Sequence, residues 1–140
     1  RLSIAGDFEF FGRAEWRAVA RGYELTFASE RTMDPSLMYQ AVRQGDVDVI
    51  SAFSTDGRIS AYGLVVLQDD RNAIPPYDAV MLASESLARR RPEVIRALAM
   101  LRGRIDAETI RELNFAVDHE GRSVADTARA FLGTLDFRTR

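Results

Sequence analysis

The sequence predicts an α/β fold, and three features carry that prediction. Strand-like and helix-like patterns alternate through the first half of the chain. A Pro- and Asp-containing stretch at 69–77 then interrupts these patterns, and the rest of the chain is predicted to form helices with no strands of its own. A βαβαβ rhythm favours a sheet that is at least partly parallel, so we expect the first half to contain that sheet.

The first half contains two predicted helices between four predicted strands. Leu2–Ala5 is a short apolar run, and Asp7 is a suitable N-cap for a helix ending near Gly22, with Phe8, Phe11, Trp16 and Val19 on its apolar face. Asp34-Pro35 predicts the start of a second helix that ends near Gly45. The other strands are predicted at Tyr23–Ala28, Val47–Phe53 and Leu64–Leu67.

The second half predicts a stiff crossing followed by helices. The pair Pro75-Pro76 disfavours helix and stiffens the segment at 69–77. A short apolar run, Ala79–Ala83, comes next, and Ser123 with Asp126 resembles a capping box. The helices are expected at Ser84–Arg91, Pro92–Leu101, Asp106–Val117 and Ser123–Leu135. A helical layer with no sheet to cover indicates that further sequence completes it.

Composition excludes several classes of function. All 19 basic residues are Arg and there is no Cys, which removes Schiff-base and thiolate catalysis and Cys-based metal sites. The net charge is −2 with no basic stripe, so nucleic acid is not an expected partner. His119 lies among polar residues, and a solvated side chain is the favoured interpretation. We therefore expect neither an enzyme nor a cofactor or metal site. The chain begins with Arg1 and shows no targeting signal, so we expect it to be part of a longer polypeptide.

Four residues are candidates for binding a ligand, and each has a plainer interpretation. Arg13 lies between Glu9 and Arg17 at helical spacing, which is typical of a surface ion-pair stripe, but its planar fork also suits a carboxylate. Phe53 and Thr55 follow a predicted strand and would face a ligand crevice, although a phenylalanine such as Phe53 is on its own more often core than site. Tyr77 is either a packed linker residue or a rigid wall for a cation.

Several motifs follow one another along the chain, and the most specific is Phe-Ser-Thr-Asp-Gly-Arg-Ile at 53–59. This ordered series resembles the C-terminal half of OpuAC/ProX-type osmoprotectant-binding proteins. The order and spacing match along essentially the whole chain, through the helices containing Leu113-Asn114 and Ala128–Leu132. The other matching runs lie at 6–13, 33–41, 45–50, 67–70 and 75–77. The family usually has Tyr at position 53 and Asp-Gly at positions 15–16, where this chain has Phe and Glu-Trp.

The resemblance implies a type II periplasmic-binding-protein-like fold in which two lobes close on a quaternary ammonium ligand. Residues 1–68 would be the second lobe, 69–78 the returning hinge and 79–140 the mainly helical return segment of the first lobe. The family's site implies that Arg13 binds the ligand carboxylate and that Phe53 and Tyr77 form two walls of an aromatic box. Thr55 would make a polar contact or shape the turn.

The function implied is the substrate-binding module of an ABC importer for glycine betaine, choline or a related osmoprotectant. Its partner would be a permease, either as a separate subunit or as a fused transmembrane domain, which places the module on the outer face of the membrane. The alternative is a ligand-sensing domain of a transcription regulator with the same two-lobed fold. We also expect the chain alone to self-associate, because helices without a sheet expose apolar surface.

Overall fold

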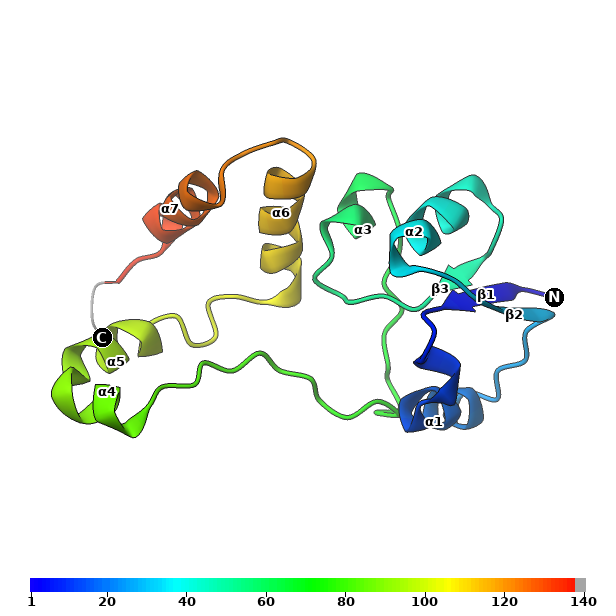
Figure 1. Cartoon of the computed structure of the whole chain (residues 1–140), viewed down its shortest axis with the longest axis horizontal. Coiled ribbons are helices and arrows are strands. Elements are labelled where there is room, and N and C mark those ends of the chain that lie inside the picture. Colours follow the sequence, from blue (N-terminus) through cyan, green and yellow to red (C-terminus); the bar gives the residue numbers. More distant parts are fainter. Residues whose placement is uncertain (138–140) are drawn as a thin grey trace.

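The computed structural model describes residues 1–137, and its first half contains a small parallel sheet (Figure 1). The strands are β1 (Ser3–Gly6), β2 (Ser29–Thr32) and β3 (Val49–Ile50), in the order β2-β1-β3. Ile4 of the central strand lies opposite Glu30 on one side and Val49 on the other. The fold is therefore α/β with parallel strands, which confirms the predicted class. Parallel pairing also puts the carboxyl ends of all three strands at one edge.

The helix α2 (Pro35–Gln44) covers the sheet and forms the core with it. Asp34 caps it by accepting a hydrogen bond from the Ser36 amide, and Gly45 ends it at a φ of 80°. Both signals are local, and the predicted helix is confirmed. Met38 packs against Ala5 of β1 and against Val47, which precedes β3, and all three side chains are buried. This cluster fixes the sheet and, with it, the loops at the carboxyl edge.

The helix predicted from Asp7 to Gly22 is wrong as a single element. The chain forms a short 3-10 turn, η1 (Phe10–Gly12), then an extended Arg13 at φ −74° and ψ 152°, then α1 (Ala14–Gly22). Asp7 accepts hydrogen bonds from the amides of Glu9 and Phe10, so it caps the short turn rather than the long helix. The break accompanies packing of the Phe10 and Phe11 rings on Trp16, at centroid distances of 5.2 and 5.5 Å.

Two of the predicted strands do not form in the described chain, and a third is shorter than predicted. Within 23–28 there is no strand; pairing with β1 begins only at Ser29. Of the predicted run Val47–Phe53 only Val49–Ile50 pairs. Leu64–Leu67 is unpaired and mostly exposed, with Val65 82% exposed. A short apolar run becomes a strand only when a neighbouring strand pairs with it, and residues 1–137 provide none for this run.

The linker after α3 (Gly57–Ala61) is hydrogen-bonded to Tyr23, the residue that follows α1. The Tyr23 hydroxyl lies 2.5 Å from Asp69 Oδ1, and it accepts a hydrogen bond from the Arg71 amide. Burial, together with the Asp69 hydrogen bond, raises the pKa of Tyr23 to about 12. Asp69 also accepts from the amides of Ala73 and Ile74. Beyond this clamp, residues 75–84 contain no helix or strand.

All four helices predicted for the second half are present. They are α4 (Glu85–Arg90), α5 (Pro92–Ala99), α6 (Ala107–Asp118) and α7 (Val124–Thr134). The Ser123 hydroxyl caps α7 through the Asp126 amide, as the capping pattern predicts. Helix α6 packs against α3 of the first half, while α4 packs on α5 (Figure 1). The predicted domain boundaries remain predictions, and α6 belongs physically with the α/β part as well as with α7.

Candidate functional site

The candidate site lies at the carboxyl edge of the sheet, where two loops follow neighbouring strands. Residues 7–13 follow β1, and residues 51–56 follow β3. Ligands of open α/β sheets bind outside the carboxyl ends of the strands. This topology places three of the four predicted residues, Arg13, Phe53 and Thr55, in loops at the same edge.

Arg13 stands at the N-terminus of α1 with its guanidinium accessible. Its Nη2 donates to Glu9 Oε2 at 2.9 Å, and its side chain is 48% exposed. That hydrogen bond, together with the negative charge of Asp7, raises the pKa of Arg13, which therefore stays charged. Glu9 occupies one donor of a group that has five. The expected surface ion pair with Glu9 thus exists, and the remaining donors leave capacity for a ligand carboxylate.

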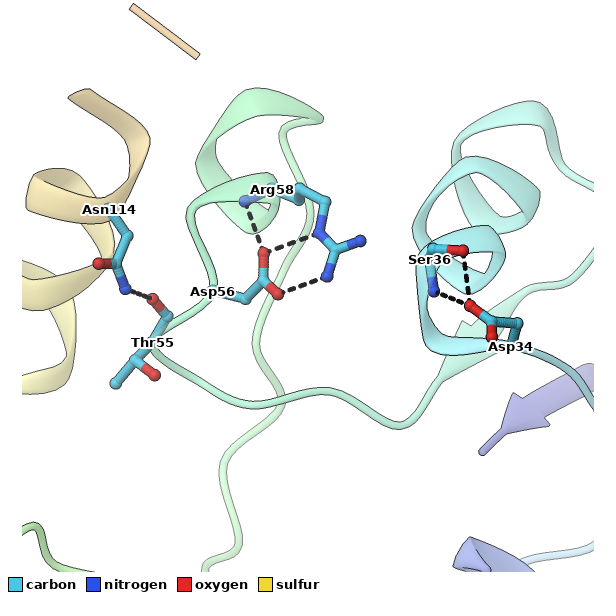
Figure 2. Close-up of polar contacts among 6 residues, drawn as sticks. All are labelled: Asp34, Ser36, Thr55, Asp56, Arg58 and Asn114. Atoms are coloured by element: carbon cyan, nitrogen blue, oxygen red, sulfur yellow. Dashed lines mark hydrogen bonds and ion pairs between the residues drawn. The ribbon is translucent and has the colours of Figure 1, made fainter. Parts of the chain in front are cut away.

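The turn carrying Phe53 and Thr55 is held by Asp56. The Asp56 amide donates to the Phe53 carbonyl at 3.0 Å. The Asp56 carboxylate caps α3 through the Arg58 amide and also accepts two hydrogen bonds from the Arg58 guanidinium, as Figure 2 shows. That guanidinium stacks over the buried Tyr39 ring at 3.9 Å. The turn is thereby tied to α2, because Tyr39 is part of that helix.

Hydrogen bonds keep two carboxyl groups near this edge, those of Asp56 and Asp34, in their ionised form. Burial acts to raise the pKa of Asp56, but the hydrogen bonds from Arg58 outweigh it and hold the pKa below its usual value. Asp34, at the carboxyl edge after β2, has its pKa lowered by the hydroxyl and amide of Ser36, which both donate to it (Figure 2). Both carboxylates are therefore ionised at neutral pH, and both already have donors.

The two aromatic candidates expose their rings. Phe53 is 75% exposed in its turn, and Tyr77 is 87% exposed on the linker. Neither ring pairs with another aromatic ring within residues 1–137. Within residues 1–137 neither Phe53 nor Tyr77 is a buried core residue. Their role as walls of one box remains a prediction.

One contact at this turn was not foreseen from the sequence. Asn114, in the middle of α6, donates from Nδ2 to the Thr55 carbonyl oxygen at 2.8 Å (Figure 2). The only signal in the sequence was the place of Leu113-Asn114 in the resemblance, which gave Asn114 no role. Asn114 is half-buried, and a polar amide that is partly removed from water usually has a hydrogen-bond partner.

Other sites expected to be absent can be checked only over the described part of the chain. Within residues 1–137 no group of three His, Cys, Asp or Glu side chains could hold a metal ion. The exposed His119 ring stacks on Phe115 at a centroid distance of 5.5 Å. No helix in that range has the length and apolarity to cross a membrane.

A parallel sheet with an available arginine fork and an exposed aromatic ring at its carboxyl edge defines a ligand-binding α/β lobe. A family model described as the substrate binding domain of the ABC-type glycine betaine transport system, OpuAC, matches residues 1–134. The chain belongs to the OpuAC family.

Named relatives are transport proteins. A carnitine transport binding protein, OpuCC of Listeria monocytogenes, is 33% identical over 117 residues, which cover 84% of this chain and 38% of the relative. The ergothioneine transport permease/ergothioneine binding protein EgtU of Helicobacter pylori is 29% identical over 135 residues, 96% of this chain and 24% of the relative. Neither name points to a transcription regulator.

A solved structure confirms the fold. The crystal structure of a glycine betaine/carnitine/choline ABC transporter protein superposes with a TM-score of 0.85 at 34% identity, covering 94% of this chain and 49% of that one. The predicted type II periplasmic-binding-protein fold is thereby confirmed. The chain spans half or less of the length of these proteins.

Proposed function

We propose that this chain supplies one side of the ligand site in the substrate-binding module of an ABC importer for quaternary ammonium osmoprotectants such as glycine betaine or choline. The observation that carries the proposal is the placement of Arg13 and Phe53 in loops that follow adjacent parallel strands. Glycine betaine, carnitine and ergothioneine share a trimethylammonium group and a carboxylate. An arginine fork and an aromatic face match those two groups.

Arg13 and the two aromatic residues bind groups of opposite charge on the ligand. Arg13 binds the carboxylate by replacing or sharing its contact with Glu9, since a planar fork can donate to two carboxylate oxygens side by side. Phe53 presents a ring face to the cation, and Tyr77 adds a second face from the linker. The proposed function involves no bond breaking. The chain binds and releases its ligand, and no cofactor takes part.

The partner is a permease of the same importer, and the module acts on the outer side of the membrane. Support comes from the family description, which is that of an ABC-type transport domain. The relative EgtU is named as both permease and binding protein, so fusion of the two functions in one polypeptide has a precedent among similar sequences.

The ring faces can be tested with leucine, which keeps apolar bulk and removes the π-face. Phe53→Leu and Tyr77→Leu should each weaken glycine betaine binding to the full-length protein by about threefold to tenfold, since cation–π contacts are worth about 0.5–2 kcal/mol. Melting temperatures should change little because both rings are exposed. Calorimetric titration measures the affinity, and Phe137→Leu, at the far end of the chain, is the matched control.

Two results would refute the proposal. Unchanged affinity in both leucine variants would refute the aromatic box. Failure of the unaltered protein to bind glycine betaine, carnitine or choline would refute the proposed class of ligand.

A further inference from the structure

Helix α6 touches the turn at 53–57 more closely than side-chain packing alone allows. A Cβ placed on Gly57 would lie 2.6 Å from the Phe115 backbone nitrogen, so only glycine permits this approach. The two backbones therefore meet directly. At the same place the Asn114 amide reaches the Thr55 carbonyl at 2.8 Å (Figure 2).

The Thr55 carbonyl depends on this contact. The neighbouring Phe53 carbonyl is bonded within the turn by the Asp56 amide, and the Asp56 side chain is bonded by Arg58. The Thr55 carbonyl instead accepts its hydrogen bond from Asn114, 59 positions further along the chain. Asn114 thus adds the external restraint on the middle of the turn.

Phe53 needs such a restraint because its own packing provides little. A side chain that is 75% exposed is not locked by neighbours, and its direction follows from the backbone that carries it. A binding group must be held close to its productive geometry by the residues around it. The backbone at 53–56 is consequently the part of the site that benefits most from a fixed position.

We propose that Asn114 is a positioning residue for the ligand turn: its amide holds the Thr55 carbonyl, and so fixes Phe53 and Thr55 in the orientation that receives the ligand. The inference rests on the proposed function. It also assigns α6 to the ligand site, although α6 follows the linker and carries none of the predicted contact residues.

Replacing Asn114 by aspartate provides a test that depends on protonation. In Asn114→Asp the ionised carboxylate faces a carbonyl oxygen and repels it, whereas the protonated form can donate a hydrogen bond as the amide does. A half-buried carboxyl without a donor has a pKa above its usual value near 4. Lowering the pH toward 4.5 should therefore restore the contact.

The experiment titrates glycine betaine into the full-length protein between pH 7.5 and pH 4.5. At pH 7.5 we expect Asn114→Asp to bind about tenfold more weakly than the unaltered protein, and Asn114→Ala about threefold more weakly. At pH 4.5 the aspartate variant should recover most of its affinity and the alanine variant should not. Glu112→Gln, on the exposed side of the same helix, is the control and should match the unaltered protein.

Other charged and ionisable groups lie nearby, so each profile is divided by that of the unaltered protein. They lie on or beside α6 and the two helices in contact with it, α3 and α7: Asp56, Arg58, Arg111, Glu112, Asp118, His119, Asp126 and Arg129. Their effect is common to all variants and cancels in the ratio.

The outcomes separate the two proposals. Equal affinity of Asn114→Asp and the unaltered protein at pH 7.5 overturns the positioning role. Parallel profiles for the aspartate and alanine variants also overturn it, because lost packing and not the hydrogen bond would then explain the weakening. Should the aspartate variant fail to fold, the alanine variant decides, and unchanged affinity there is a refutation. No binding by the unaltered protein at any pH is a failure of the proposed function.

Discussion

The two halves of the molecule differ in how their helices are stabilised. Every buried hydrophobic side chain in residues 1–137 lies at or before Ile59, in and around the sheet. The side chains of Ser84 and Ser123 cap α4 and α7, and α5 begins at Pro92. None of these three helices has a buried apolar side chain, and the residue buried in α7 is Thr127. Local signals are therefore enough to define these helices, whereas a core requires pairing between distant segments.

The difference also bears on the proposed site. The half with its own core holds the loops at the carboxyl edge rigidly, and those loops contain Arg13, Phe53 and Thr55. The second half contributes an exposed linker with Tyr77, and one helix, α6, that returns to the first half. The two halves are therefore in contact through α6, in addition to the hydrogen bonds between Tyr23 and the linker.

The largest expected effect compares apolar truncation in the two halves. Ile59 is 4% exposed, so Ile59→Ala should lower the free energy of unfolding by about 2–4 kcal/mol. Leu98 in α5 is 37% exposed, and Leu98→Ala should cost under about 1 kcal/mol. Urea unfolding followed by circular dichroism measures both. Similar losses would mean that the second half has a core of its own.

A pair of glycines tests the junction between the halves. Gly57→Ala places a methyl group against the α6 backbone and should destabilise the protein by about 1–3 kcal/mol. Gly133 lies in α7 with open space at its Cβ position, so Gly133→Ala should stabilise that helix by about 0.5–1 kcal/mol. Thermal unfolding gives both signs. A neutral Gly57→Ala would show that α6 does not pack tightly on α3.

The smallest effect concerns the exposed apolar run after the linker. Val80 and Leu82 are 75% and 93% exposed, and such surface favours association of the 140-residue chain. Replacing both by Ser should shift the chain toward monomer in light scattering at micromolar concentration. Ala83→Ser, an exposed neighbour, is the control. A chain that is monomeric without any substitution would contradict the expected self-association.

The sequence was sufficient wherever the determining residues are close together. Asp34-Pro35 and Gly45 delimit α2, and Ser123 begins α7, because caps act within one turn. It was misleading where distant partners decide. The run Tyr23–Ala28 alternates as a strand should, but β1 pairs with the polar residues that follow it.

The candidate site divides in the same way. Phe53 could be proposed because it lies at the end of a predicted strand, and Arg13 because its planar fork suits a carboxylate and because the family resemblance places it at the site. The contribution of Asn114 depends on α6 folding back over the turn, and no spacing in the sequence indicates that return. The break at Arg13 was missed as well, since aromatic packing on Trp16 accompanies it.

The measurement that bears most directly on the central claim compares two ligands on one variant. Arg13→Ala in the full-length protein should weaken glycine betaine binding about tenfold or more, because a charge-assisted contact with the carboxylate is lost. Choline has no carboxylate, so its affinity should change by less than about twofold. Arg21→Ala, at an exposed position of the same helix, should change neither. Equal losses of affinity for both ligands in the calorimeter would contradict the account, because Arg13 would then not be the residue that binds the carboxylate.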